Sequence, residues 1–405
     1  MFMKTRIVYL VLLLKCLLIT NTSNAQYTLN SDSAFKSGSA NSGRIWGYAF
    51  GDYAYKTHGD SLIRGGSNQY TGFAQTKTAF AFRRIYLGYD YNITKKFSAE
   101  LLLAAEDNFN QTSATGVNTT SGDLLTNNKI AFYIKLANIR WKNIWKGSDF
   151  VLGQVNTPAF SLLTEKVWSY RSIERTIADV RRTPSFDMGA TLQGKFDAKG
   201  NYGYDLMVGN GTGARPENDK FKWFYGDVFA MFMNKKLVFD LYADYERLNR
   251  VDGFHHSRNM IKSFAAYNTP ALTIGLEAFV NYKHKDVVGF RGADKDTLDA
   301  TSTGLSAYIH GDIIKGKLRY FVRYDTYNPD TKYDNGNYTK YIGFTPNYEP
   351  SNKENFFTAG LDFMPVKNVH FMPNIWYNKY KTNQVLANTD HDLVYRVTFF
   401  YVFGK

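Results

Sequence analysis

The amino-acid sequence predicts an all-β protein, a transmembrane antiparallel up-and-down β-barrel of about sixteen strands. Three observations favour this fold. Apolar and polar residues alternate with period two in many segments, and the connections between these segments alternate between long and short. Aromatic residues make up 17% of the chain, yet its mean hydropathy is −0.37. Strands that face lipid on one side and water on the other have this composition.

The period-two alternation is clearest in the second half of the chain. In residues 237–246 the odd positions are apolar or aromatic, whereas the even positions include Asp240 and Asp244. Residues 272–282 and 317–325 repeat the pattern. Charged side chains in the middle of a strand beside bulky aromatic ones do not fit the core of a soluble sandwich, but they fit a lipid face and a wet lumen.

The alternation divides the chain into sixteen predicted strands. The segments near 43–55 and 223–234 alternate poorly, which leaves the strand count open by two. An even number of strands places both chain ends on the periplasmic side. The predicted strands are 43–55, 78–92, 97–107, 129–140, 149–157, 187–197, 202–210, 223–234, 236–247, 260–268, 270–282, 302–313, 316–327, 354–365, 369–380 and 391–403.

The connections between these strands give an independent indication of a barrel. Residues 56–77, 108–128 and 158–186 are long connections, and each is followed by a short one, such as 93–96 or 141–148. Long extracellular loops that alternate with short periplasmic turns are typical of outer-membrane barrels. A secreted β-sandwich or β-helix, the alternative for an exported all-β chain, predicts no such alternation.

The first 25 residues have the order of a secretory signal. A short basic start is followed by an apolar run over 7–19 and by small residues at Ser23 and Ala25, which predicts cleavage before Gln26. As a membrane anchor, the run falls short of the roughly 20 apolar residues that span a bilayer. The predicted organisation is a cleaved signal peptide (1–25), an N-terminal periplasmic segment (26–42) and the transmembrane barrel (43–405).

The composition excludes several classes of function. The single cysteine, Cys16, leaves with the signal, so the exported chain has no disulfide to stabilise it. The formal net charge of +13 would suggest nucleic acid as a partner in a cytosolic protein, but an exported barrel is not expected to bind it. An anion-attracting pore or surface explains the charge better, and the expected partners are outer-membrane lipid and small polar or anionic solutes.

Strand parity predicts which charged side chains face the lumen. Acids gather on the third, ninth and eleventh predicted strands and bases on the thirteenth and sixteenth, so opposed patches would create a field across the lumen. Alternatively, each charge pairs with a neighbouring strand and serves stability alone. The predicted lumen-facing bases are Arg84, Lys135, Lys195, Lys317, Arg319, Arg323 and Arg396, and the acids are Glu100, Glu106, Asp240, Asp244, Glu246 and Glu277.

Two stretches of sequence resemble a known family. GQVNTP at 153–158 precedes a long loop that contains YRSIER at 170–175, and FRRIYLGY at 82–89 is followed after a short turn by FSAE at 97–100. These motifs are similar to those of the phosphate-selective porin O and P family, particularly its Bacteroidota-type members. The resemblance covers the whole exported chain in pattern and these stretches in motif.

The resemblance implies that the third extracellular loop, 158–186, folds into the lumen and narrows it. Guanidinium groups on such a loop would attract anions. The alternative is that Glu165, Glu174, Asp179 and Asp187 pair with the arginines and only hold the loop in place. The residues that the resemblance assigns to the constriction are Arg171, Arg175, Arg181, Arg182, Glu174 and Asp179.

Enzymatic and metal-dependent functions find little support in the sequence. The adjacent His255 and His256 have no partners at the spacing of a metal site, and no serine and histidine are arranged as a nucleophile and its base. A plug domain does not fit into the 26–42 segment. We therefore expect no enzyme activity, no cofactor and no bound metal.

The sequence thus predicts an outer-membrane porin, a passive diffusion channel for small hydrophilic solutes with a mild preference for anions. The alternative is a non-conducting barrel that binds surfaces or serves a structural role. The aromatic final strand, 393–403, resembles the signal that the barrel-assembly machinery recognises, although Gly404 and Lys405 follow it. A homotrimer is expected only by analogy with porins in general.

Overall fold

The strands form one closed barrel. The computed structural model describes residues 40–64, 68–106, 125–126, 129–130, 132–181, 184–249, 253–333, 337–338, 340–343, 352–382 and 389–404. The predicted signal peptide, the part of the 26–42 segment up to residue 39, and Arg182 lie outside the described residues. No helix in the described part of the chain is long and apolar enough to cross a membrane.

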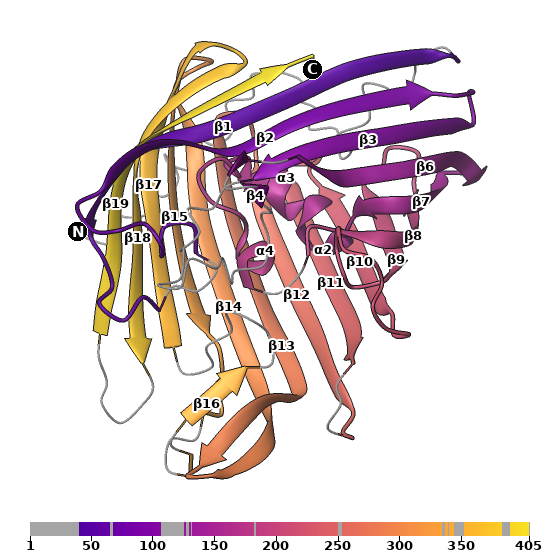
Figure 1. Cartoon of the computed structure of the whole chain (residues 1–405). Coiled ribbons are helices and arrows are strands. Elements are labelled where there is room, and N and C mark those ends of the chain that lie inside the picture. The colour runs from indigo at the N-terminus through magenta and orange to yellow at the C-terminus, as the bar shows by residue number, and fades with distance from the viewer. Residues whose placement is uncertain are drawn as a thin grey trace, which may run out of the picture.

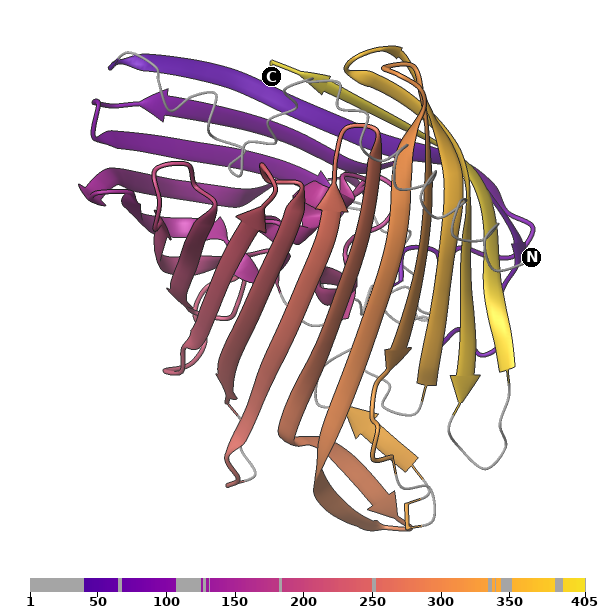
Figure 2. The same ribbon diagram turned by 180° about the vertical axis from the view of Figure 1, so that it is seen from behind.

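Sixteen antiparallel strands make up the barrel, which confirms the predicted fold class. Strand β1 (Ser42–His58) pairs with β2 (Thr78–Asn92) on one side and with β19 (Thr389–Phe403) on the other, so the sheet has no free edge (Figures 1 and 2). The other barrel strands are β3 (Phe97–Glu106), β6 (Tyr133–Trp145), β7 (Ser148–Asn156), β8 (Phe186–Lys195), β9 (Tyr202–Gly209), β10 (Trp223–Phe232), β11 (Leu237–Leu248), β12 (His256–Asn268), β13 (Leu272–Arg291), β14 (Asp294–Ile314), β15 (Leu318–Asn328), β17 (Asn352–Val366) and β18 (Val369–Thr382).

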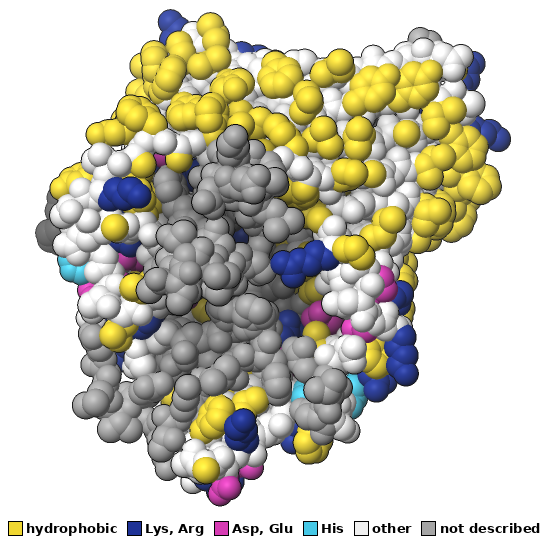
Figure 3. All heavy atoms as spheres, viewed as in Figure 1, with side chains coloured by type: hydrophobic (Ala, Val, Ile, Leu, Met, Phe, Trp, Pro, Cys, Tyr) yellow, Lys and Arg dark blue, Asp and Glu magenta, His cyan; other side chains and the backbone are white. Residues whose placement is uncertain are grey.

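The two faces of the barrel differ as the alternation predicts. On β11, Phe239 and Leu241 are 44% and 53% exposed on the outer face, whereas Asp240 on the inner face is 4% exposed. Exposed apolar side chains gather in a band across the upper part of the barrel in Figure 3, above a region with more charged side chains. In the final strand Tyr395 and Val397 belong to this exposed set. An apolar band of this kind is the surface that a barrel presents to lipid.

Two strands reach further than the alternation predicts. Strands β13 and β14 extend to Arg291 and back from Asp294, so residues 283–301, which the sequence assigns to a loop, form a long hairpin. The short strand β16 (Lys340–Gly343) pairs with its tip. The hairpin projects beyond the barrel wall (Figure 1). Outside the membrane no lipid face requires apolar alternation, so this extension leaves little periodic signal in the sequence.

The fourth strand also begins later than expected. The sequence assigns it to 129–140, but the barrel strand is β6, from Tyr133 to Trp145. The preceding residues instead form a separate small hairpin of β4 (Leu125–Thr126) and β5 (Lys129–Ile130).

The third long loop turns into the barrel, as predicted. It follows β7 and contains three short helices, α2 (Pro158–Ser161), α3 (Thr164–Trp168) and α4 (Ile177–Arg181). Helix α2 contacts β10, α3 contacts β12 and β13, and α4 contacts β14. Figures 1 and 2 both show these helices within the ring of strands. The loop therefore occupies part of the lumen.

Candidate functional site

The loop is attached to the inner wall by an aromatic core. Trp168, Tyr170 and Ile173 are buried. The centroid of the Trp168 ring lies 4.9 Å from that of Tyr308, and the centroid of the Tyr170 ring lies 4.7 Å from that of Phe321. The inner face of β10, β11, β12, β14 and β15 contributes buried apolar side chains to this core. Because apolar side chains leave water only where they meet other apolar groups, this part of the wall determines where the loop packs.

Cationic side chains of the wall hold the backbone of the loop. Arg396 donates from Nη2 to the Ile173 carbonyl oxygen at 2.6 Å, and Arg323 donates from Nη1 to that of Arg175 at 2.7 Å. His310 donates from Nε2 to the Val167 carbonyl at 3.0 Å. A loop made of very short helices leaves many of its carbonyl groups without partners of its own. Arg323 and Arg396 thus lie on the inner face, where parity placed them, but they bind the loop.

Glu174 joins the loop to two other parts of the barrel. Its Oε2 accepts hydrogen bonds from Trp376 Nε1 on β18 at 2.8 Å and from Gln69 Nε2 in the first long loop at 2.6 Å. Burial raises the pKa of Glu174, but the charge of Arg175 and the hydrogen bonds from Trp376 and Gln69 outweigh it, so the pKa lies below its ordinary value of 4.5. The carboxylate form therefore stabilises the attached loop.

The lowered pKa of Glu174 predicts that acid weakens the attachment of the loop. A group whose pKa is lowered by folding stabilises the folded state fully above its ordinary pKa, and this contribution is lost as the pH falls through the lowered value. We therefore expect single-channel current noise and mean conductance to rise as the pH falls below about 4.5. The control is Glu174→Gln, which should show the acid behaviour already at neutral pH. Identical pH profiles in both proteins would contradict the prediction.

The arginines of the loop pair with acids. Arg171 contacts Glu165 and donates from Nη1 to Asp179 Oδ2 at 2.7 Å. Arg175 Nη1 lies 3.9 Å from Asp179 Oδ1. These pairs agree with the alternative prediction that acids of the loop pair with its arginines and hold it in place. Asp187, which that prediction also includes, does not pair with an arginine of the loop that the structure describes. Asp187 accepts hydrogen bonds from the Gly211 backbone at 2.6 Å and from the Tyr225 hydroxyl at 3.0 Å.

Arg181 has a partner that sequence spacing does not indicate. Its two terminal nitrogens donate to both oxygens of Glu354 on β17, at 2.9 and 2.8 Å. Burial lowers the pKa of Arg181, but Glu354 outweighs it and holds that pKa above its ordinary range. A bidentate pair of this kind fixes geometry as well as charge. The loop is consequently held at α4 as well as at α3.

One charged face of the loop remains in contact with water. The side chains of Arg171 and Glu165 keep 14% and 25% of their exposure inside the ring of strands. Arg171 interacts electrostatically with Tyr48 on β1 and Tyr86 on β2. This face of the loop therefore lies toward the wall that contains β1, β2 and β3.

That wall carries a mixed charge. Lys135 Nζ lies 2.8 Å from Glu106 Oε1, and Arg84 Nε lies 3.4 Å from Glu106 Oε2. The Tyr86 hydroxyl donates to the same carboxylate at 3.1 Å. Arg84 and Lys135 thus lie on the inner face, as strand parity predicts, and they share one acid.

The opposite wall beneath the loop is similarly paired. Lys262 Nζ lies 2.6 Å from Asp240 and also donates to Thr164 of the loop at 3.0 Å. Asp244 accepts hydrogen bonds from the Met260 backbone and the Tyr242 hydroxyl, both at 2.8 Å. Glu277, Asp244 and Asp240 are all buried on the inner face. Lys262 thus anchors the loop, a role that no pattern in the sequence predicts.

Two predicted lumen bases take other positions. Lys317 lies in the turn between β14 and β15 and Lys195 is the last residue of β8, and both are exposed at the barrel end. Parity within a strand does not orient side chains at or beyond the strand end, which explains the difference. Arg319, at the start of β15, does face inward: its guanidinium carbon lies 6.0 Å from the centroid of the Tyr170 ring in the loop, and its Nε is 2.9 Å from Asp312 Oδ1.

The fold and the site together define a porin-type fold: a closed, sixteen-stranded antiparallel β-barrel with a loop folded into its lumen. No family model and no curated protein matches the chain. Among solved structures it is similar to the outer membrane channel DcaP of Acinetobacter baumannii, with a TM-score of 0.62 and 11% identity over 90% of this chain and 98% of that one.

Two other solved structures have a similar fold. Vibrio cholerae OmpT has a TM-score of 0.55 and 10% identity over 90% of this chain and 99% of that one. Salmonella typhi OmpF, in complex with daunomycin, has a TM-score of 0.54 and 12% identity over 90% of this chain and 98% of that one. At these identities the similarity is one of fold.

Proposed function

We propose that this protein is an outer-membrane porin through which small hydrophilic solutes diffuse passively. The observation that carries the proposal is the charged face of the loop inside the closed barrel, where the side chains of Arg171 and Glu165 are partly exposed. Barrels of about sixteen strands are wide enough to hold an aqueous channel beside a folded loop. The apolar outer band fits the lipid of the outer membrane.

Single-channel recording in a planar bilayer tests this function. Purified, folded protein should insert and give steady ohmic conductance, whereas the same preparation unfolded by heat should give none. A folded barrel without conductance would overturn the proposal and favour a non-conducting surface or structural protein, with the loop as a plug.

The recording also tests association of the barrels. We infer a homotrimer, because a structure of Vibrio cholerae OmpT with a TM-score of 0.53 is described as a trimer form. The outer face of β10 to β13 supports the inference, since small side chains such as Ala230, Ser263 and Ala265 leave a depression of about 390 Å³ there. Three linked channels insert together and close in three equal steps, whereas independent barrels close in single steps.

We further propose membership of the phosphate-selective porin O and P family and a mild anion preference. The motif residues Arg171 and Arg175 support this proposal because both guanidinium groups are partly exposed inside the barrel. Glu165 and Asp179 compensate part of their charge. The preference should therefore be small, and inorganic phosphate is the anion to test against chloride.

Replacing Arg171 by glutamine should move the channel toward cation preference. The change removes the cation that pairs with Glu165 and one of the two cations beside Asp179, where only Arg175 remains. A unit charge at 4 Å in water contributes about 1 kcal/mol, so we expect at most a roughly fivefold change in the cation-to-anion permeability ratio. The measurement is the reversal potential under a potassium chloride gradient. Glu165→Gln is the matched control and should shift the potential in the opposite direction; equal potentials in all three proteins would contradict the prediction.

A further inference from the structure

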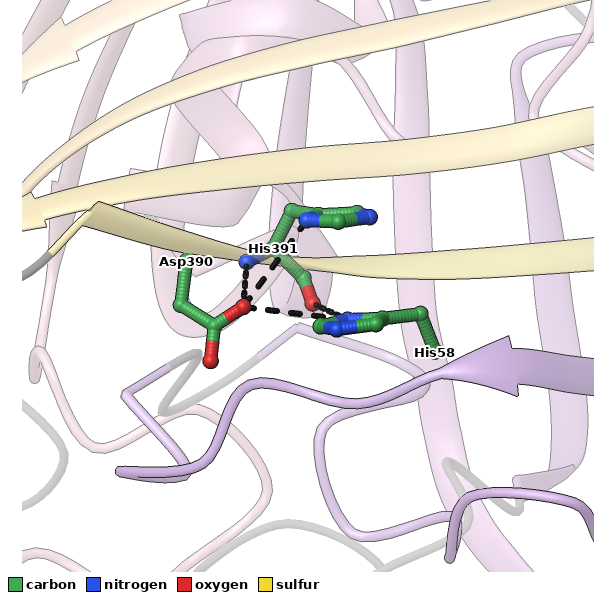
Figure 4. A group of neighbouring side chains, drawn as sticks. All are labelled: His58, Asp390 and His391. Atoms are coloured by element: carbon green, nitrogen blue, oxygen red, sulfur yellow. Dashed lines mark hydrogen bonds and ion pairs between the residues drawn. The ribbon is translucent and has the colours of Figure 1, made fainter.

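The extracellular end of the barrel seam carries a group of side chains that the proposed transport function does not use. His58 ends β1, and Asp390 and His391 begin β19, so the three meet where the barrel closes (Figure 4). One ligand atom from each lies within 4.8 Å of the others. Sequence spacing indicates no metal site, because His58 and His391 are 333 positions apart in the sequence, but closure of the barrel brings them together.

An irregularity in β1 places His58 in this group. Lys56 is opposite Val394 and His58 is opposite Leu393, so Thr57 is an extra residue in β1. A bulge of this kind turns the side chain that follows it. The imidazole rings of His58 and His391 lie parallel, with centroids 4.0 Å apart and an angle of 3° between their planes.

The hydrogen bonds of the group determine which ring nitrogen of His58 carries the proton. His58 Nδ1 lies 2.8 Å from the His391 carbonyl oxygen, and because a carbonyl only accepts, this nitrogen carries the proton. The lone pair of His58 is therefore on Nε2. Histidines that bind metals commonly donate their second ring N–H to a backbone carbonyl in this way.

The carboxylate is held beside both rings. Asp390 Oδ2 accepts from the Ser61 backbone at 2.9 Å, and Oδ1 lies 3.7 Å from His58 Nδ1 and 3.8 Å from His391 Nδ1. The side chains of His58 and His391 are 40% and 32% exposed, so an ion can reach them from solution.

We propose that His58, Asp390 and His391 bind a divalent transition-metal ion, with Zn²⁺ the best match. Two imidazoles and one carboxylate form a common three-ligand set for zinc and leave one position for water. Bonds of 2.0–2.1 Å around a tetrahedral ion place the ligand atoms about 3.4 Å apart. The Asp390 Oδ1 distances to the two Nδ1 atoms, 3.7 and 3.8 Å, exceed this by a few tenths of an ångström. Binding through His58 Nδ1 requires that nitrogen to give up its proton and its hydrogen bond to the His391 carbonyl, whereas binding through Nε2 requires the His58 ring to turn about its side-chain bonds.

A bound ion would link β1 to β19 at the seam through its protein ligands. The ligands come from opposite ends of the chain, so the unfolded chain brings them together only at a large cost in entropy. An ion that binds the folded barrel alone stabilises it by mass action. The site should therefore couple metal binding to the stability of barrel closure.

The test is Co²⁺ and Zn²⁺ binding to the full, untagged, refolded protein in detergent. Wild-type protein should bind one Zn²⁺ per barrel by calorimetry, show the visible absorption of tetrahedral Co²⁺, and unfold at a higher temperature with Zn²⁺ present. His58→Ala and His391→Ala should each weaken binding at least tenfold and lose the Co²⁺ spectrum.

The matched control is His284→Ala. His284 forms a comparable pair with Asp299, with His284 Nδ1 3.1 Å from Asp299 Oδ1, but it does not belong to the three-residue group. This variant should bind Zn²⁺ as the wild type does. Heat-shifted migration on gels verifies that each variant is folded. The proposal is overturned if folded wild-type protein binds no Zn²⁺, or if folded His58→Ala and His391→Ala proteins bind it as tightly as the wild type.

Discussion

Replacing Trp168 by alanine should release the loop from the wall and increase the conductance of the barrel. The Trp168 side chain is fully buried, and it packs against Tyr170 and Tyr308 while the Arg323 guanidinium lies over its ring at 5.2 Å. Its Nε1 donates to the Glu174 carbonyl at 2.8 Å. Truncation of a buried tryptophan costs about 3–5 kcal/mol, which here falls on the attachment of the loop rather than on the strands.

The measurements are single-channel conductance and limited proteolysis within residues 158–186. We expect larger, noisier currents and faster cleavage in the loop, with the barrel still folded. The control is Trp145→Ala, because Trp145 lies at the end of β6 and is 53% exposed. Unchanged conductance together with unchanged proteolysis would show that the remaining contacts suffice to hold the loop.

The strands could be predicted from the sequence because lipid and water impose a local rule. Each residue of a membrane strand faces either lipid or the lumen. The adjacent residues Phe239 and Asp240 follow this rule, because Phe239 is on the outer face and Asp240 is on the inner face. The rule ends where the strand leaves the membrane. The long hairpin of β13 and β14 and the exposed Lys317 beyond a strand end both fall outside it.

The anchors of the loop could not be predicted in the same way. Arg323, Arg396 and His310 contact the loop across 143 to 223 positions of sequence, and no local pattern distinguishes an inner-face cation that meets water from one that meets a carbonyl. The family resemblance indicated the loop and its arginines, but not that Arg181 pairs with Glu354.

Because of these pairings, the net positive charge of the chain is a poor guide to the ion selectivity of the channel. Much of the inner-face charge is bound to the loop or to a neighbouring acid, as Lys262 is to both Asp240 and Thr164. Buried pairs of this kind interact strongly with one another and less with ions in the channel. Selectivity should therefore depend on the few exposed groups, such as Arg171 and Glu165, rather than on the net charge.

The largest loss of stability is expected for Asp52→Ala. Asp52 is fully buried on β1, its Oδ2 lies 2.5 Å from Arg83 Nε on β2, and it accepts a hydrogen bond from Thr398 on β19 at 2.5 Å. Arg396 on β19 approaches the same carboxylate to 3.9 Å. Without it, two buried guanidinium groups lose their counter-charge. Breaking a buried ion pair from one side costs about 3–5 kcal/mol.

The same change should act at two places at once. Arg83 and Arg396 also bind the loop carbonyls of Ser172 and Ile173, so the carboxylate fixes the arginines that fix the loop. Urea unfolding in lipid should shift to lower concentration in Asp52→Ala, with Asp52→Asn intermediate because the amide keeps the shape and loses the charge. Asp294→Ala, at an exposed aspartate, should unfold as the wild type does. If Asp52→Ala also matches the wild type, the seam does not depend on this carboxylate, and the β1–β19 ladder and the loop core alone must close the barrel.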